Sequence, residues 1–175
     1  VIRVNGLEEL FELVLAFEDQ PLPKDRNVLI ITNGGGPGIL TADACEKNGL
    51  ELPLLEFELI EELRSQLPPH ASLSDPLDVL GDADEGRYGL ALKAGLKSQN
   101  VDGIIVILTP QAMTPSEKIA EIVAEVRRPS DKPILASFLG LDDNSDAVQT
   151  LLKNNILNYA FPESAVFALK TMYDF

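Results

Sequence analysis

A glycine-rich segment is the first part of this sequence that could do chemistry. It spans residues 33–38 and directly follows the apolar run 27–32. Glycines leave backbone N–H groups uncovered, and the start of a helix carries about half a unit of positive charge. Together they predict a site for an anion such as phosphate. The residues concerned are Asn33, Gly34, Gly35, Gly36 and Gly38. The alternative is a tight turn that brings the next helix close to a strand.

Known glycine motifs narrow the choice of ligand. A Walker A loop needs Lys and then Ser or Thr after its last glycine, whereas Gly38 is followed by Ile39 and Leu40. The dinucleotide-binding fingerprint needs Gly or Ala in place of Ile39 and an acid after the second strand, where only Glu56 is near. A P-loop is therefore excluded and a dinucleotide site disfavoured. A phosphorelay receiver is also excluded, because Asn33 and Thr109 stand where its acids would be.

A second polar segment, residues 109–114, follows the buried run 103–108. Its hydroxyl and amide groups come from Thr109, Gln111 and Thr114, and its position after a strand predicts a ligand contact. The alternative is that Thr114 caps a helix whose first residue is Pro115. The candidate binding residues of this segment are Thr109, Pro110, Gln111, Ala112 and Met113.

A third segment, residues 70–84, contains several carboxylates that could hold Mg²⁺. Asp75-Pro76 is also a good turn, and Asp82 or Asp84 can cap the following helix. We therefore predict turns and caps here, and no metal site.

His70 and Cys45 are the only residues of their types. No Ser or Cys in a nucleophile context accompanies His70, and Pro68-Pro69 makes its connection stiff, so we predict a hydrogen-bonding prop for the acidic segment. Cys45 falls within an apolar helical pattern and is predicted to be a buried, inert thiol. One Cys and one His also exclude a disulfide framework and a multi-histidine or thiolate metal site.

Composition excludes further classes of function. The 175 residues carry a net charge of −14, which repels nucleic acid and anionic lipid surfaces. The apolar run 103–108 is far shorter than the roughly 20 residues of a membrane span, and no leader pattern opens the chain. We therefore expect a cytoplasmic protein that binds neither nucleic acid nor membrane. We also expect an excised domain of a longer protein, because the chain begins at Val1.

The elements that must position these segments alternate between helix and strand. Strands are predicted at 27–32, 50–55, 103–108, 133–138 and 156–160, with a brief extended piece at 77–80. Helices are predicted at 7–17, 39–47, 58–67, about 84–97, 114–126 and 146–153, and one begins at Pro162. The first helix is expected to bury one face, formed by Leu7, Leu10, Phe11, Val14 and Phe17.

This alternation predicts an α/β fold, flavodoxin-like and doubly wound, with a mainly parallel sheet of about five strands and helices on both faces. We expect one domain over residues 1–175, with 1–26 as an N-terminal helical extension and 27–175 as the core.

The motifs taken together resemble the ADP-forming, or nucleoside-diphosphate-forming, acyl-CoA synthetase family, whose members are relatives of succinyl-CoA synthetase. The resemblance covers nearly the whole chain in order and spacing. The segments that carry it are Asn33-Gly34-Gly35-Gly36-Pro37-Gly38, Pro68-Pro69-His70-Ala71-Ser72, Asp75-Pro76-Leu77-Asp78 and Thr109-Pro110-Gln111-Ala112-Met113-Thr114.

The resemblance implies a ligase that interconverts acid, CoA and ATP with acyl-CoA, ADP and phosphate through an acyl phosphate and a phosphohistidine. This chain resembles the second flavodoxin-like domain of such an enzyme. It lacks the phosphohistidine loop, so the resemblance implies that this histidine lies upstream and that no catalytic residue is in this chain. The glycine segment would then lie at the phosphate and acyl site, with residues 109–113 beside the acyl carboxylate.

The implied partners are a CoA-binding domain, a phosphohistidine domain and an ATP-grasp domain or subunit, in an oligomeric enzyme. The domain alone is expected to bind no cofactor, whereas the assembled enzyme would use CoA, ATP or ADP, and Mg²⁺. Two alternatives remain open: a non-catalytic regulatory or structural domain, as in some protein acetyltransferases, and a free-standing flavin or nucleotide module.

Overall fold

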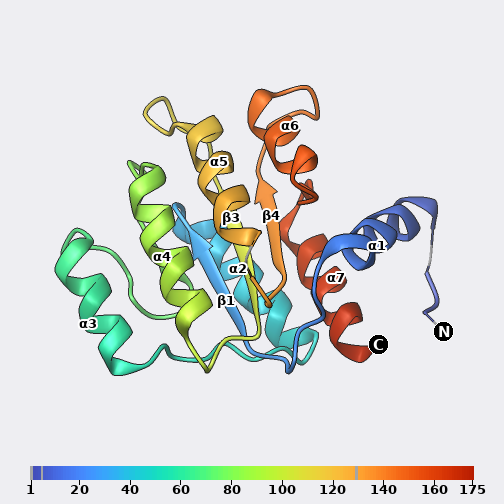
Figure 1. The fold of residues 1–175 in the computed structure, drawn as a ribbon, viewed down its shortest axis with the longest axis horizontal. Coiled ribbons are helices and arrows are strands. Elements are labelled where there is room, and N and C mark those ends of the chain that lie inside the picture. Colours follow the sequence, from blue (N-terminus) through green and yellow to red (C-terminus); the bar gives the residue numbers. More distant parts are fainter. Residues whose placement is uncertain (1, 5, 129) are drawn as a thin grey trace.

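The computed structural model describes residues 2–4, 6–128 and 130–175 of the chain. Its centre is a parallel sheet of four strands in the order β2-β1-β3-β4 (Figure 1). The strands are β1 (Val28–Thr32), β2 (Leu77–Asp78), β3 (Gly103–Leu108) and β4 (Ile134–Phe138). This is the doubly wound, flavodoxin-like α/β fold that the sequence predicts, with fewer strands than expected.

The central strands are buried along their whole length, as an apolar run covered on both faces must be. In register, Ile30 of β1 lies opposite Ile105 of β3, and Ile31 lies opposite Leu77 of β2. The extended piece expected after Pro76 is thus confirmed as an edge strand of two residues.

Two of the expected strands are wrong, because each is reduced to a single bridge. In 50–55 only Glu51 pairs, with Asn27, and Pro53 has no N–H to continue a ladder. In 156–160 only Asn158 pairs, with Ala136, and its side-chain oxygen accepts the N–H of Phe138 at 2.7 Å. An Asn side chain therefore takes a donor that a further strand would have used.

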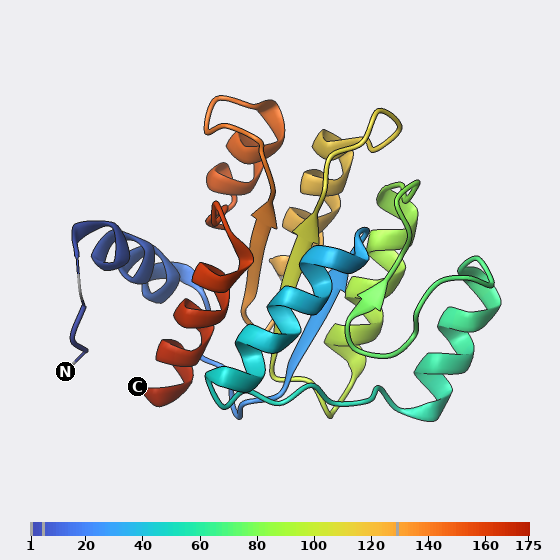
Figure 2. The same cartoon turned by 180° about the vertical axis from the view of Figure 1, so that it is seen from behind.

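Helices cover both faces of the sheet (Figures 1 and 2). One hydrophobic cluster joins the sheet to residues of α3, α4, α5 and α6, and the second joins it to residues of α1, α2 and α7. The helices are α1 (Leu7–Asp19), α2 (Gly35–Lys47), α3 (Phe57–Gln66), α4 (Glu85–Lys97), α5 (Ser116–Arg127), α6 (Asp146–Lys153) and α7 (Pro162–Asp174). Pro162 is the first residue of its helix, as predicted.

Helix α1 does not bury the face that we expected. Its buried residues, among those whose burial is described, are Leu13 and Ala16, and neither belongs to the expected face. The expected residues Leu7, Leu10, Phe11 and Val14 are 40–72% exposed.

The reason is the anchor at the end of the helix. The buried Gln20 side chain donates to the carbonyl of Ile134 and accepts its N–H, both at 3.1 Å. Phe17, which is only partly buried, meets the ring of Phe175 edge-on at 5.3 Å. These contacts fix the rotation of the helix, which periodicity alone cannot do.

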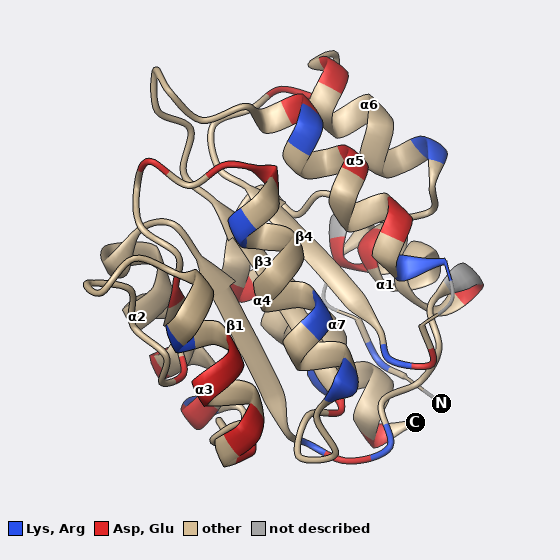
Figure 3. Ribbon diagram, turned by 60° about the vertical axis from the view of Figure 1, so that its left-hand side comes forward, with Lys and Arg blue, Asp and Glu red and all other residues tan. Residues whose placement is uncertain are grey.

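Acidic residues are spread over several helices, among them α3 and α5, rather than gathered on one (Figure 3). Among the described residues, no helix is long and apolar enough to cross a bilayer.

Lys132 closes the C-terminal end of α4. Its ammonium group donates to the carbonyls of Gly95, at 3.1 Å, and Leu96, at 3.0 Å, and also to that of Ser98. We expect Lys132→Met to lower the free energy of unfolding by about 2 kcal/mol, because these carbonyls lose a charged donor. Urea denaturation measures this effect, and Lys93→Met, at an exposed position of the same helix, is the control. Equal stability of the two variants would contradict the assignment.

Candidate functional site

The candidate site lies where successive helices change from one face of the sheet to the other. Strands β1 and β3 are neighbours, but α2 follows β1 on one face and α5 follows β3 on the other. In doubly wound sheets such a switch point, at the carboxyl ends of the strands, is where ligands bind. The glycine segment and residues 109–114 both begin there, as predicted.

Asn33 joins the two strand ends. It is 2% exposed, its Oδ1 accepts the N–H of Thr109 at 2.7 Å, and its Nδ2 donates to the carbonyl of Thr109 at 3.0 Å. The amide is thus engaged with backbone at both ends, so Asn33 acts on the site by positioning the two loops. The expectation that it contacts a ligand stays a prediction.

Helix α2 begins at Gly35, four residues earlier than the expected start at Ile39. Pro37 falls in the first turn, where its missing N–H costs no hydrogen bond. The N–H of Gly38 already bonds to the carbonyl of Gly34 at 3.2 Å. An anion at this helix start would therefore meet the N–H groups of Gly35 and Gly36, because the first N–H groups of a helix have no partner within it.

The glycines of this segment differ in what surrounds them. A Cβ at Gly38 would lie 3.0 Å from Thr32 Cγ2 and 3.3 Å from Pro76 Cβ, and one at Gly34 would lie 3.0 Å from Thr109 Oγ1. Close packing thus explains these two glycines. A Cβ at Gly36 would have nothing within 4 Å. The tight-turn interpretation therefore does not account for Gly36.

The start of α2 also differs from other helices in charge. Each helix from α3 to α7 has an acidic residue in its first turn, whereas the first turn of α2, all of which is described, has none. No side chain caps α2 either. No residue of the first turn or cap therefore neutralises the partial positive charge at this end of the helix. Such a helix end suits an incoming anion.

The loop after β3 lies against the loop after β2. Thr114 donates from Oγ1 to the carbonyl of Gly81 at 3.4 Å, and a Cβ at Gly81 would lie 2.6 Å from Gln111 Nε2. The expectation that Thr114 caps α5 is wrong, because that helix begins at Ser116 with Pro115 before it and no side-chain cap.

The hydroxyl of Thr109 is the unexplained group in this loop. Its Oγ1 is buried and has no hydrogen-bond partner among the described residues. The predicted binding residues that follow it, Pro110, Gln111, Ala112 and Met113, are all exposed. The loop thus offers one buried hydroxyl beside Gly34 and an open surface beyond it.

The acids of segment 70–84 take part in a turn, a helix cap and an ion pair. Asp78 Oδ1 accepts the N–H of Leu80 at 2.8 Å, Asp84 caps α4 through the N–H of Arg87 at 3.0 Å, and Asp82 forms an ion pair with Arg87 at 2.6 Å. Within the described part of the chain, no group of three or more His, Cys, Asp or Glu residues could hold a metal ion. The Asp84 cap is as predicted.

Three neighbours of the site were missed by the sequence analysis. Asp78 Oδ2 lies beside the start of α2, 3.7 Å from where a Cβ of Gly35 would be. Tyr88 donates to the carbonyl of Ile107 at 2.9 Å below the site, and burial raises the pKa of its hydroxyl. Arg87 holds the loop after β2 through the carbonyl of Val79 at 3.2 Å. The extended piece at 77–80 was the available signal, because its carboxyl end must reach the same sheet edge.

His70 and Cys45 lie outside the site. His70 is exposed and makes no hydrogen bond with any residue in the described part of the chain, so its predicted role as a prop is wrong. A stiff Pro-Pro connection directs its ring to solvent rather than to the acids. Cys45 is buried, as predicted, and burial raises the pKa of its thiol to about 12, which disfavours the reactive thiolate.

The geometry defines a class: a doubly wound α/β domain with an open helix start at its switch point, suited to an anionic group. The particular family follows from sequence. A sequence model of the Ligase-CoA domain matches residues 28–175, and the chain belongs to this family.

Relatives of known name agree with this assignment. The chain is 41% identical over 172 residues to acetate–CoA ligase [ADP-forming] II subunit alpha of Pyrococcus furiosus, covering 96% of this chain and 37% of that protein. It is 34% identical over 174 residues to 4-hydroxybutyrate–CoA ligase [ADP-forming] of Nitrosopumilus maritimus, covering 99% of this chain and 25% of that one.

A solved structure shows the same fold. The dinucleotide-forming acetyl-coenzyme A synthetase 1 of Ca. Korarchaeum cryptofilum, in complex with phosphate and ADP, superposes with a TM-score of 0.90 at 28% identity. The match covers 99% of this chain and 38% of that one. The chain therefore spans about a quarter to two fifths of the length of these relatives.

Proposed function

We propose that this chain is one domain of an ADP-forming acyl-CoA ligase and that its α2 start holds a phosphoryl group during transfer. The observation that carries the proposal is the pair of open N–H groups at Gly35 and Gly36, at the switch point of the sheet. Donors aimed at developing charge are the main contribution a protein makes to phosphoryl transfer. The relatives described above are named as ligases, which favours this function over a regulatory domain.

The surroundings of the α2 start indicate how a phosphoryl group would approach. Asp78 Oδ2 lies on the Gly35 side and would repel a phosphoryl group there, whereas the space at Gly36 is open. The phosphoryl group would therefore enter at Gly36. The Asp78 carboxylate would then face the group that carries the phosphate, and it suits a carrier with an N–H donor, such as an imidazole.

The remaining predicted residues take roles around this anion. Thr109 would direct its buried hydroxyl to the ligand, with Asn33 holding both loops in place. Residues 110–113 form the exposed surface that an acyl group could approach. The assignment of Asn33, Gly34, Gly35, Gly36, Gly38, Thr109, Pro110, Gln111, Ala112 and Met113 to the phosphate and acyl site is part of this proposal.

The other half of the site would come from a neighbouring domain. Ile39 and Leu40, just after the glycines, are 61% and 58% exposed, and Met113 is 76% exposed. Apolar side chains around a polar site are typical of a docking surface. We propose that a phosphohistidine domain docks here, within an oligomeric enzyme that also has CoA-binding and ATP-grasp parts and uses CoA, ATP or ADP, and Mg²⁺. Residues 27–175 would form the core of this domain and 1–26 its extension.

The location of the phosphohistidine tests the proposal. When the complete enzyme is incubated with ATP, acid-labile phosphate is expected on a histidine outside residues 1–175. His70→Asn should leave both this labelling and stability unchanged, because the exposed ring makes no hydrogen bond with a described residue. Mass spectrometry locates the phosphate, and finding it on His70 would overturn the proposal.

A further inference from the structure

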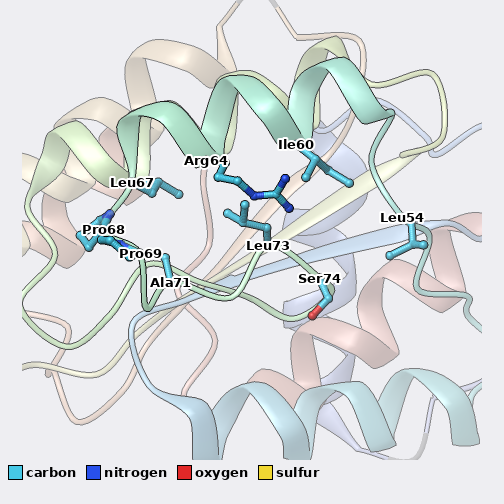
Figure 4. Close-up of a pocket in the computed structure, with 9 residues that line it drawn as sticks. All are labelled: Leu54, Ile60, Arg64, Leu67, Pro68, Pro69, Ala71, Leu73 and Ser74. Atoms are coloured by element: carbon cyan, nitrogen blue, oxygen red, sulfur yellow. The ribbon is translucent and has the colours of Figure 1, made fainter.

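A cavity of about 640 Å³ lies between α3 and the segment 68–74, beside the edge of the sheet that β2 forms (Figure 4). Its walls are largely hydrocarbon. They include Leu54, Ile60, Leu67, Pro68, Ala71 and Leu73. Pockets for small molecules range over roughly 300–1,000 Å³ and are lined mainly by apolar side chains with a few polar groups. The volume and lining of this cavity fall within that description.

Two polar side chains line the same cavity. The guanidinium of Arg64 extends between Ile60 and Leu73, and Ser74 lies at the end near Leu54 (Figure 4). Arg64 Nη1 pairs with Glu61, whereas Nε and Nη2 have no partner among the described residues. The guanidinium can therefore still present N–H donors to a second carboxylate.

Helix α3 is held to the domain by few buried groups. Leu63 is its only buried residue among those described. Leu59 and Ile60 are partly buried against the same cluster. At the surface, Lys97 pairs with Glu62 at 3.6 Å, and the N–H of Gln99 donates at 2.6 Å to Glu56, just before the helix. A ligand that filled the cavity would add apolar contact to the partly exposed side of this helix, so burial of the ligand's hydrocarbon body would favour binding.

We propose that this cavity binds a small monoanionic organic acid, with its hydrocarbon body between α3 and Leu73 and its carboxylate on Arg64. The chain carries a net charge of −14, so polyanions are repelled at long range and a single carboxylate suits the one guanidinium. The inference does not depend on the proposed function.

The cavity is also connected to the candidate site. Ser72, within segment 68–74, exchanges two backbone hydrogen bonds with Asp78, each at 3.1 Å. Asp78 lies beside the start of α2, as described above. An acid bound in the cavity would thus contact the segment that positions Asp78. Its binding could therefore alter the position of Asp78 at the candidate site.

Octanoate is a suitable probe, because it combines a flexible hydrocarbon chain with one carboxylate. Titrated into the ¹⁵N-labelled chain at neutral pH, it should shift amide resonances of α3 and residues 71–74 in a saturable way. Arg64→Gln should weaken binding about tenfold or more, the usual effect of losing a charge-assisted hydrogen bond. Arg128→Gln removes an arginine that bonds to Asn154 instead, and should bind octanoate as the wild type does.

Two results would overturn the proposal. Absence of saturable shifts in α3 and 71–74 would show that the cavity does not take such an acid. Equal binding of octanol and octanoate, or equal binding by the Arg64→Gln variant, would show an apolar docking surface in which Arg64 recognises no carboxylate. A third variant, Ala71→Trp, fills the cavity without altering Arg64 and should abolish binding if the ligand lies inside.

Discussion

Replacing Gly36 with valine in the complete enzyme is expected to slow phosphoryl transfer by on the order of a hundredfold, comparable to the loss of an oxyanion donor, because the side chain would block access to the backbone N–H. A branched side chain in the second position of α2 would stand in the space where the phosphoryl group approaches. The fold should be unaffected, because a Cβ at Gly36 meets nothing within 4 Å and valine is no worse a helix former than glycine. Single-turnover transfer from labelled enzyme measures the rate, and thermal unfolding measures stability.

Gly86 offers a matched control for this substitution. It occupies the second position of α4, as Gly36 does in α2, but the start of α4 is capped by Asp84. A Cβ there would lie 3.3 Å from Asp84 Oδ1, so Gly86→Val should lower stability slightly and leave phosphoryl transfer unchanged. If Gly36→Val lowered transfer only in proportion to the loss of folded protein, the glycine would be a turn-former and the anion site would be refuted.

Gly38→Ala gives the contrasting case within the same segment. Its Cβ would press on Thr32 and Pro76, at 3.0 and 3.3 Å, so its main effect should be on stability. Sequence alone could not separate Gly36 from Gly38. Both are glycines near a helix start, and only the packing of β1 and Pro76 against one of them distinguishes their roles.

The sequence predicts most of the fold because its strands and helices have strong local signals. The buried strand Gly103–Leu108 and the helix Asp146–Lys153 have the predicted bounds. Prediction fails where a distant contact decides. The single bridge at Glu51 is too short to be a strand, and the rotation of α1 depends on Gln20, whose side chain bonds to Ile134 more than a hundred residues away.

The candidate site, like the fold, could be predicted only where local signals decide. The two loops at the ends of β1 and β3 could be located from the order of strands and helices. The positions of Asp78 and Gly81 could not, because they depend on how the loop after a two-residue strand folds back. Leu80 adopts a left-handed backbone, with φ of 75°, and the side chain of Asp78 accepts its N–H. No periodic pattern marks such a turn.

A buried carboxyl group below the site should make the domain more stable in acid than in base. Asp75 accepts the N–H of Ile30 at 3.0 Å through Oδ1, while Oδ2 is buried without a partner among the described residues. Burial raises the pKa of Asp75 from its ordinary value of 3.8 to about 8, so the folded state keeps this carboxyl protonated at neutral pH. The unfolded chain releases the proton above pH 4, which favours unfolding as the pH rises.

Asp75→Asn should abolish the loss of stability that this carboxyl causes as the pH rises. Between about pH 4 and pH 8 the wild type should lose about 1.4 kcal/mol of unfolding free energy per pH unit from this group, and nothing more above pH 8. Asparagine cannot ionise and can still accept the Ile30 N–H. The unfolding free energy of the variant should therefore rise relative to that of the wild type by the same amount for each pH unit. At pH 7 the gain would approach about 4 kcal/mol, less the cost of an unpaired amide.

Urea denaturation at pH 5, 7 and 9 measures this difference, and Asp43→Asn, at an exposed position on α2, is the control that should show no such slope. A difference between Asp75→Asn and the wild type that did not change with pH would mean that Asp75 ionises in the folded state as readily as in the unfolded chain. Its environment would then have to supply a donor to Oδ2. An increase in stability from pH 5 to pH 9 that is specific to the wild type would contradict the buried, protonated carboxyl directly, because a carboxyl with a raised pKa can only lower stability as the pH rises over this range.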